Sequence, residues 1–270
     1  MHASEREGLI LELLASRGFV SFRELERQLE GSPATIRRDL NRLAQQKRII
    51  RVRGGAKAVG QGELRSFPAA KRLAGMPFAE NIKHNLAEKR AIAKVAASLC
   101  VPGEGVMIDG GTTTFQMCPY LAGLNLQVLT NSLHIVGELM NQAGTRVLVP
   151  SGTVFPEQAI ILSAFGEEGM PKFHAPKLFM GAGAISAQGL LQADIILVAA
   201  ERRLIERAEE VIVLVDATKF GGSSGAVVCG LDSIDTIITD DRVSDRAAAM
   251  INNAGVRLII ASEAGLKNHA

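Results

Sequence analysis

The sequence predicts an α/β protein in two parts, a small basic N-terminal module and a larger domain built on a parallel β-sheet. Three observations predict this. The chain has 270 residues, more than one domain of typical size needs. Its positive charge is concentrated between residues 32 and 57, where eight Lys and Arg residues accompany a single Asp. From residue 88 onward, short apolar runs alternate with helical segments, which is typical of a mostly parallel sheet covered on both faces.

Composition and charge exclude several classes of protein. The chain is 47% hydrophobic and 21% charged, as expected for a globular protein, and it contains no apolar run of the roughly 18 residues that a membrane span needs. Its first eight residues are polar and do not resemble a secretion signal. Cys100, Cys118 and Cys229 are widely spaced in apolar surroundings, which indicates buried thiols rather than disulfides or metal ligands. We therefore expect a soluble cytoplasmic protein with no metal and no cofactor.

The basic module begins with three helices. The first covers residues 5–17, where apolar residues recur at helical spacing before a glycine. Ser21 and Glu24 form a capping-box pattern that starts a second, short helix. Ser32 followed by Pro33 supplies an N-cap and a proline at the first helical position, and this third helix extends to about Gln46. The residues at helical spacing in the first helix are Leu9, Ile10, Leu13 and Leu14. The expected inward-facing residues of the second and third helices are Phe22, Leu25, Leu29, Ile36, Leu40 and Leu43.

A basic hairpin follows the third helix. Residues 48–53 alternate like a strand, and Gly54-Gly55 is a hairpin turn signal. Three helices and a basic hairpin form a winged helix-turn-helix, in which the third helix enters the major groove and the wing lies against the phosphates. The expected DNA-binding residues are Ser32, Thr35, Arg37, Arg38, Asn41, Arg42, Arg51, Arg53 and Lys57.

These cations have a second interpretation, a solvated surface on which Arg38 or Arg42 pairs with Asp39. The Ser-Pro helix start and the Gly-Gly wing, taken together with the arginines, favour DNA binding. The runs 32–40 (SPATIRRDL) and 50–56 (IRVRGGA) also resemble the signature of DeoR-type bacterial regulators of sugar metabolism.

Residues 58–80 contain Gly and Pro without sustained periodicity, which predicts a linker or hinge. Phe67, Leu73 and Phe78 within it could dock on either domain. The expected division is therefore a DNA-binding domain at 1–57, a linker at 58–80 and an α/β domain at 81–265.

In the larger domain, we expect a helix over 91–99 and ligand-binding loops at the carboxyl ends of the strands. The expected strands are 106–109, 127–130, 146–150, 178–181, 211–216, 236–239 and 257–261. The expected helices between them are 115–122, 133–141, 194–208 and 246–254.

Polar residues and glycines follow five of these strands. The loop 109–114 (DGGTTT) combines glycines, which allow close backbone approach, with threonines at a helix start, and this suits a phosphate. It lacks the Lys of a P-loop. Each loop also has a plainer interpretation, as a turn, a helix cap or, for Lys219, a solvated cation. Together they favour a small anionic ligand. The expected effector-binding residues are Asp109, Gly111, Thr112, Thr113, Thr114, Asn131, Ser132, Gly152, Gly181, Asp194, Glu201 and Lys219.

The family resemblance extends over almost the whole chain. Residues 85–90 (NLAEKR), 109–114, 129–132 (LTNS) and 216–220 (DATKF) resemble the DeoR-type effector domain. That resemblance implies a fold similar to ribose-5-phosphate isomerase and glucosamine-6-phosphate deaminase. It also implies a phosphorylated sugar as effector, and a bacterial repressor of a carbohydrate operon.

The chain departs from the common family pattern at two places. Gly181-Ala-Gly-Ala184 stands where many members have Gly-Ala-Asp-Gly, and residues 199–202 (AAER) stand where many have Glu-x-x-Lys. The segment 189–194 (GLLQAD) with Ala200-Glu201 resembles the L-ascorbate-utilisation repressor branch, which implies a sugar-acid or ascorbate-type phosphate. Asp194 and Glu201 could bind ligand hydroxyls, or could be a helix N-cap and an exposed helix charge.

The alternative to a sensor is an isomerase-like enzyme with an appended DNA-binding domain. Isomerisation needs a general base, usually a carboxylate. Residues 181–185 stand where ribose-5-phosphate isomerases carry a Gly-Ala-Asp-Glu-type segment, and both carboxylates of that segment are absent here. The five histidines are scattered, and His134 is expected at the surface. We therefore expect no catalytic residues. An architectural DNA-binding protein would not need the α/β domain.

The symmetry of paired operator half-sites predicts a homo-oligomer, either a dimer or a tetramer.

Overall fold

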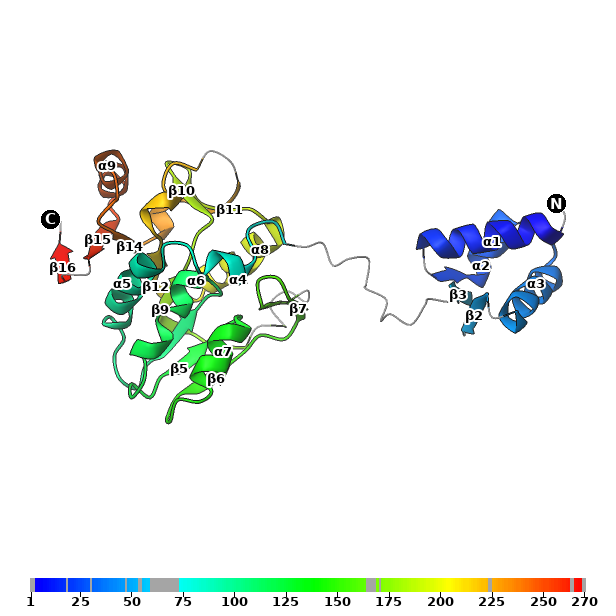
Figure 1. Cartoon of the computed structure of the whole chain (residues 1–270), viewed down its shortest axis with the longest axis horizontal. Helices are drawn as coiled ribbons and strands as arrows, with labels where there is room; N and C mark the ends of the chain where they lie inside the picture. Colours follow the sequence, from blue (N-terminus) through cyan, green and yellow to red (C-terminus); the bar gives the residue numbers. More distant parts are fainter. Residues whose placement is uncertain are drawn as a thin grey trace. The chain divides into compact units, whose positions relative to one another are not determined.

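The computed structural model describes residues 3–17, 19–29, 31–46, 48–52, 55–58, 73–163, 169, 171–222, 225–262 and 265–268. The chain divides into two compact units, Met1–Ala70 and Lys71–Ala270, and each is described by itself (Figure 1).

The first unit is a winged helix-turn-helix, as predicted. Its three strands form an antiparallel sheet in the order β1-β3-β2. The elements are α1 (Ala3–Arg17), β1 (Phe19–Ser21), α2 (Phe22–Gln28), α3 (Pro33–Gln45), β2 (Ile49–Val52) and β3 (Gly55–Ala58). The side chains of Ser21 and Ser32 cap α2 and α3 by accepting hydrogen bonds from the N–H groups three residues on. Strand β1 was not predicted.

A buried ion pair joins the first helix of this unit to the third. Arg6 Nε donates to Asp39 Oδ2 at 2.8 Å, and both side chains are at least nine-tenths buried. Arg42 Nη2 lies 3.1 Å from the other carboxylate oxygen, and Arg42 also pairs with Glu7. The pairing of Arg42 with Asp39 is therefore present, and Arg6 is a partner that the sequence did not suggest. The apolar core of this unit includes Ile10, Leu14, Leu25, Ile36, Leu40 and Leu43.

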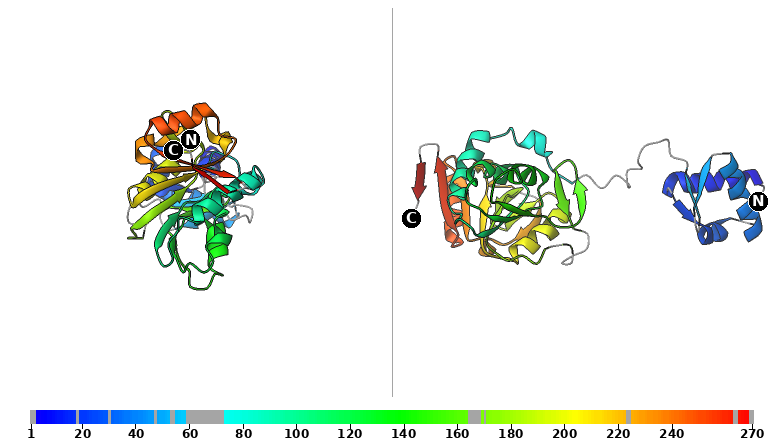
Figure 2. Two further views of the ribbon diagram at one scale, coloured as in Figure 1. Left: turned by 90° about the vertical axis from the view of Figure 1, so that its left-hand side faces the viewer. Right: turned by 90° about the horizontal axis from the view of Figure 1, so that it is seen from below.

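The second unit contains an eight-stranded sheet in the order β16-β15-β14-β12-β9-β4-β5-β6. All neighbours are parallel except β16, which pairs antiparallel with β15. The strands are β4 (Gly105–Ile108), β5 (Gln127–Leu129), β6 (Arg146–Leu148), β9 (Ala175–Met180), β12 (Ala208–Leu214), β14 (Thr236–Asp240), β15 (Arg257–Ser262) and β16 (Gly265–Asn268). The seven predicted strands are the seven parallel ones. Figure 2 shows the sheet from two further directions.

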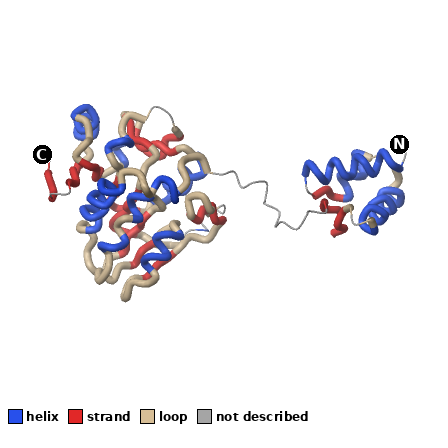
Figure 3. The backbone as a smooth tube through the Cα atoms, in the orientation of Figure 1, coloured by secondary structure: helices blue, strands red, loops and turns tan. Residues whose placement is uncertain are grey.

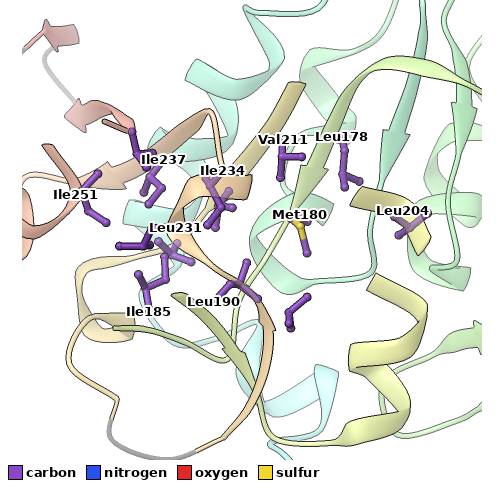
Figure 4. Packing of buried hydrophobic residues seen from close by; sticks show 14 of the residues in the cluster. Leu178, Met180, Ile185, Leu190, Leu204, Val211, Leu231, Ile234, Ile237 and Ile251 are labelled. Atoms are coloured by element: carbon purple, nitrogen blue, oxygen red, sulfur yellow. The ribbon is translucent and has the colours of Figure 1, made fainter. Parts of the chain in front are cut away.

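Helices cover both faces of this sheet, and in Figure 3 they lie around its strands. Successive residues of β9 point to opposite faces, so that Phe179 packs on one side and Leu178 and Met180 on the other. The face of Phe179 is covered by α5 (Leu86–Ala97), α6 (Thr112–Phe115), the 3₁₀ turn η1 (Cys118–Tyr120) and α7 (Leu133–Leu139). The face of Met180 is covered by α8 (Ile195–Ile205) and α9 (Asp245–Asn253) (Figure 4).

Several elements of the second unit were not predicted. They are the edge strand β16, the short helix α4 (Phe78–Asn81), the hairpin of β7 (Thr153–Phe155) and β8 (Ile160–Leu162), the small sheet of β10 (Ala184–Ser186), β11 (Gly189–Gln192) and β13 (Ala226–Cys229), and the 3₁₀ turns η3 (Ala217–Lys219) and η4 (Leu231–Ser233). The single helix expected over 115–122 is wrong. Helix α6 ends at Phe115, and the 3₁₀ turn η1 contains Pro119, which cannot donate an interior helical hydrogen bond.

The segment 73–81 packs on the second unit. Leu73 is buried with Phe155, Ile160 and Leu162, and Phe78 is also buried. Phe67, the third apolar residue considered for docking on either domain, lies outside the described residues. Within the described part of the chain, no helix is long and apolar enough to cross a membrane.

Candidate functional site

A cavity of about 300 Å³ lies at the carboxyl ends of β4, β9 and β12 in the second unit. Seven of the residues predicted to bind an effector line it: Asp109, Gly111, Thr112, Thr113, Gly181, Glu201 and Lys219. The cavity therefore lies at the edge of the sheet where a ligand site was expected.

The other five predicted residues do not line the cavity. Thr114 is buried and donates a hydrogen bond from its hydroxyl to the Asp109 carbonyl at 2.8 Å. Ser132 caps α7, and Asp194 caps α8, which is the plainer interpretation that the sequence left open for Asp194. Gly152 precedes β7, where a Cβ would lie 2.3 Å from the Leu162 carbonyl oxygen. Asn131 is buried and hydrogen-bonds to the carboxyl group of Asp109, which does line the cavity.

Asp109 is held rigidly at the end of β4. Asn131 Nδ2 donates to Asp109 Oδ1 at 2.8 Å, while Asn131 Oδ1 accepts from the Gly110 N–H at 2.7 Å. Gly110 is needed for space, because a Cβ there would lie 2.6 Å from Ile160 Cγ2. The glycine loop thus brings the strand end close to β8 and fixes the carboxyl group of Asp109.

Two acidic side chains of the cavity are buried. Burial raises the pKa of Asp109 to about 6, although the hydrogen bond from Asn131 opposes the change. The pKa of Glu201 is raised well above its usual value, by burial first and by the charge of Asp109 second. Gln192 Nε2 donates to Glu201 Oε1 at 2.5 Å. Glu201 is only 2% exposed, so the interpretation of this residue as an exposed helix charge is wrong.

Two lysines also line the cavity, and one of them was missed. Lys89 on α5 is 1% exposed, and its ammonium group donates to the Asn81 carbonyl oxygen at 2.6 Å. Burial lowers the pKa of Lys89, Asp216 opposes this, and the charge of Lys219 lowers it further. The sequence carried a signal for Lys89, because it precedes the buried Ile92 and Ala93 by three and four residues and so lies on the buried face of α5. Gln158, in the turn between β7 and β8, and Gln192, in β11, were missed because none of these three strands was predicted.

The segment 73–81 forms one wall of the cavity, with Ala74, Gly75, Met76, Phe78 and Asn81 among its lining residues. The Ala74 N–H donates to Asp194 Oδ2 at 3.1 Å, and the Phe78 N–H donates to the Glu157 carbonyl at 2.9 Å. The ring of Phe78 stacks on that of His134, with centroids 3.9 Å apart. His134 is exposed, as expected, and it supports the wall of the cavity.

In the first unit, the predicted DNA-binding residues differ in whether their side chains are already paired with neighbours. Arg37 and Arg38 are exposed near the start of α3, and the Arg37 guanidinium lies 5.0 Å from the centroid of the Phe22 ring. Ser32 and Thr35 are joined at the start of α3 by a 2.9 Å hydrogen bond between their hydroxyls. The others are tied to neighbours: Arg42 pairs with Asp39 and Glu7, and Arg51 donates to Asn41. Arg53 and the side chain of Lys57 lie outside the described residues.

Lowering the pH from 7.5 to 5 is expected to stabilise the second unit more in the wild-type chain than in Asp109→Asn. The pKa of Asp109 is about 6 in the folded chain against a usual 3.8, so over this interval the folded state binds a proton that the unfolded state lacks. Stability from this group is therefore gained as the pH falls through 6. Asp240, whose pKa is lowered, titrates below this window.

The measurement is the thermal unfolding midpoint of both proteins at the two pH values. The wild-type protein should show an upward shift larger by about 5 °C. Equal shifts in the two proteins would contradict the buried, proton-binding state of Asp109.

Two family models match separate parts of the chain. Residues 6–61 match the model of a DeoR-like helix-turn-helix domain, and residues 84–241 match that of a DeoR C terminal sensor domain. The HTH-type transcriptional regulator UlaR of Shigella dysenteriae serotype 1 (strain Sd197) is 31% identical over 259 residues, which cover 96% of this chain and 99% of that protein. UlaR of Escherichia coli O139:H28 (strain E24377A / ETEC) shows the same identity and coverage.

Solved structures give more distant similarities. A ribose 5-phosphate isomerase from Plasmodium falciparum is 12% identical, with a TM-score of 0.36 over 49% of this chain and 52% of that one. The eIF2B beta subunit from Chaetomium thermophilum is 15% identical, with a TM-score of 0.40 over 70% of this chain and 52% of that one.

Proposed function

Because the chain belongs to the DeoR family of DNA-binding transcriptional regulators, we propose that it represses a carbohydrate-catabolism operon under the control of a phosphorylated sugar or sugar acid. The family assignment makes the chain a regulator rather than an enzyme, since its relatives are named as transcriptional regulators. The observation that carries the proposal is the cavity, where two lysines and a glycine loop meet at the carboxyl edge of the sheet.

The anionic end of the effector is assigned to the lysines. Helix α6 after the glycine loop has only four residues, so its dipole contributes little. Lys89 and Lys219 supply full positive charges instead, and Lys89 is already oriented by its hydrogen bond to the Asn81 carbonyl. A phosphate is the anion that these groups suit best, because it offers several strong acceptor oxygens to both ammonium groups.

We assign DNA binding to α3 and the wing of the first unit. In a winged helix-turn-helix the start of the third helix reads base edges in the major groove, and here that position holds Thr35, Arg37 and Arg38. Paired operator half-sites would require a homo-oligomer of this chain, as a dimer or tetramer. The protein would act in the bacterial cytoplasm, where its operator lies.

The wall segment 73–81 is the proposed link between effector and DNA. Several of its residues line the cavity, and along the chain it follows the stretch that leads from the DNA-binding unit. An effector that contacts Met76 or Asn81 therefore favours one arrangement of this segment over another. Such a preference gives a coupling free energy of about 1–3 kcal/mol between effector and DNA binding.

Lys219→Ala is expected to weaken effector binding about tenfold to a hundredfold and to leave operator binding unchanged. The variant removes one charged partner of the phosphate, an interaction that contributes about 1.5–3 kcal/mol. The measurement is the effector concentration needed to change binding to an operator fragment that the purified protein selects from its host genome. Lys94→Ala, an exposed lysine on α5 outside the cavity lining, is the matched control. An unchanged effector response in Lys219→Ala would remove this residue from the site.

A further inference from the structure

The cavity has two chemically different ends. Lys89 reaches it from α5 on one face of the sheet, and Glu201 reaches it from α8 on the other face. Among the cavity-lining residues, the charge of Lys219 acts on the pKa of Lys89 and the charge of Asp109 acts on that of Glu201, while Asp216, outside the lining, raises the pKa of Lys89. A bound molecule that spans the cavity therefore meets ammonium groups at one end and carboxyl groups at the other.

One atom at the acidic end lacks a partner. Glu201 Oε1 accepts from Gln192, but Glu201 Oε2 is buried and has no hydrogen-bond partner among the described residues. Buried polar atoms are nearly always hydrogen-bonded in folded proteins, so an unpartnered oxygen in a cavity-lining side chain indicates a place for a ligand group. That group must be able to pair with a carboxyl group in a buried, weakly hydrated position.

We propose that Glu201 determines specificity by selecting an effector whose end opposite the phosphate carries an uncharged hydroxyl and by rejecting one that carries a carboxylate there. This inference rests on the proposed function, and it narrows the effector to phosphorylated sugars and polyols over open-chain phosphorylated sugar acids.

The chemistry of hydrogen bonding explains the selection. A hydroxyl both donates and accepts, so it can pair with Glu201 Oε2 whether or not the carboxyl group holds a proton. A carboxylate only accepts, and it would join Asp109 and Glu201 as a third acidic group at one end of the cavity. The charge of Asp109 already raises the pKa of Glu201, and a further negative charge at close range in this buried site is strongly unfavourable.

The test compares matched ligands that differ in one group. Hexitol 6-phosphates and the corresponding hexonate 6-phosphates differ only at C1, where CH₂OH replaces the carboxylate. Pairs in the gluco, manno, galacto and gulo configurations, with inorganic phosphate as reference, are titrated into the full chain at pH 7.5, and dissociation constants are measured by calorimetry. We expect at least one hexitol phosphate to bind about a hundredfold more tightly than its acid partner.

Glu201→Gln tests the residue itself. The amide keeps an acceptor for Gln192 and places a neutral donor at the former Oε2 position. The preference for the hexitol member should fall to less than about tenfold, mainly because the acid partner binds more tightly. Glu206→Gln, an exposed position at the end of α8, is the control and should keep the wild-type preference. If Glu201→Gln does not fold, the wild-type comparison decides the proposal alone.

The outcomes separate this inference from the proposed function. Equal binding of the two members of every pair, or tighter binding of the acid, would overturn the role of Glu201 while leaving a phosphate site in place. If every hexitol phosphate binds no more tightly than inorganic phosphate, the hydroxyl contact is overturned. Failure of inorganic phosphate and of every phosphate ester to bind would instead overturn the proposed function.

Discussion

Replacing Arg37 and Arg38 together with alanine is expected to reduce operator affinity about a thousandfold, to the level of binding to unrelated DNA. Both side chains are exposed near the start of α3, where a major-groove helix presents its base-reading residues. Each base or phosphate contact made by an arginine contributes about 1–3 kcal/mol, so the loss of two removes most of the specific binding energy. The measurement is a titration of operator and scrambled DNA at fixed salt.

The folded state should survive this double replacement. The buried residues of α3 are Ile36, Asp39, Leu40 and Leu43, none of which is changed, and the contact of Arg37 with the Phe22 ring contributes only about 0.5–1 kcal/mol at an exposed position. Arg90→Ala with Lys94→Ala removes the same charge from exposed positions of α5 and is the matched control. Specific binding retained by the Arg37 and Arg38 variant would show that α3 does not read the operator.

Asp39→Ala is expected to destabilise the DNA-binding unit by about 3 kcal/mol. Its carboxylate is buried and joins Arg6 of α1 to Arg42 of α3, and removal of one partner of a buried pair leaves charge without its main compensation. The effect is large for a unit of this size, whose whole stability is only several kcal/mol. The measurement is the unfolding of the full chain in urea, in which the first unit should unfold at a lower concentration while the second is unchanged.

A second variant, in which both Asp39 and Arg6 are replaced, distinguishes the effect of their pairing from the effect of losing a polar side chain. Replacing both Asp39 and Arg6 with leucine removes both buried charges and substitutes apolar groups, which is often neutral or stabilising. We expect this double variant to recover at least half of the stability lost in Asp39→Ala. A double variant that is less stable than Asp39→Ala would show that the polar side chains themselves, rather than their mutual pairing, maintain the contact of α1 with α3.

Local signals explain why much of the fold was predictable. Ser32 and Pro33 determine where α3 begins, since the cap and the proline act within one turn of helix. The seven parallel strands were predicted from their apolar runs, and in β4, β9, β12, β14 and β15 these runs are buried on both faces of the sheet, whereas the edge strand β6 is only partly buried. Strand β1 was missed because it has three residues, and its pairing partner β3 lies more than thirty residues away.

The candidate site was predictable only in part. Asp109 and Lys219 follow strands, and the rule for parallel sheets places such residues at one edge. Glu201 and Gln192 meet only because the β10–β11–β13 sheet packs beside α8, and nothing near them in the sequence shows this. The segment 73–81 reads as a linker because its contacts, such as Ala74 with Asp194 and Phe78 with Glu157, are with residues far away along the chain.

The positions of the cavity-lining residues along the chain have a consequence for biosynthesis. The first unit is complete at β3, whereas the cavity draws residues from Ala74 through Lys219. Chains emerge from the ribosome N-terminus first, and domains fold as units in that order. A nascent chain therefore possesses its DNA-reading helix well before it possesses the cavity. For that interval, every newly made molecule has a completed DNA-reading module without the means to respond to the effector.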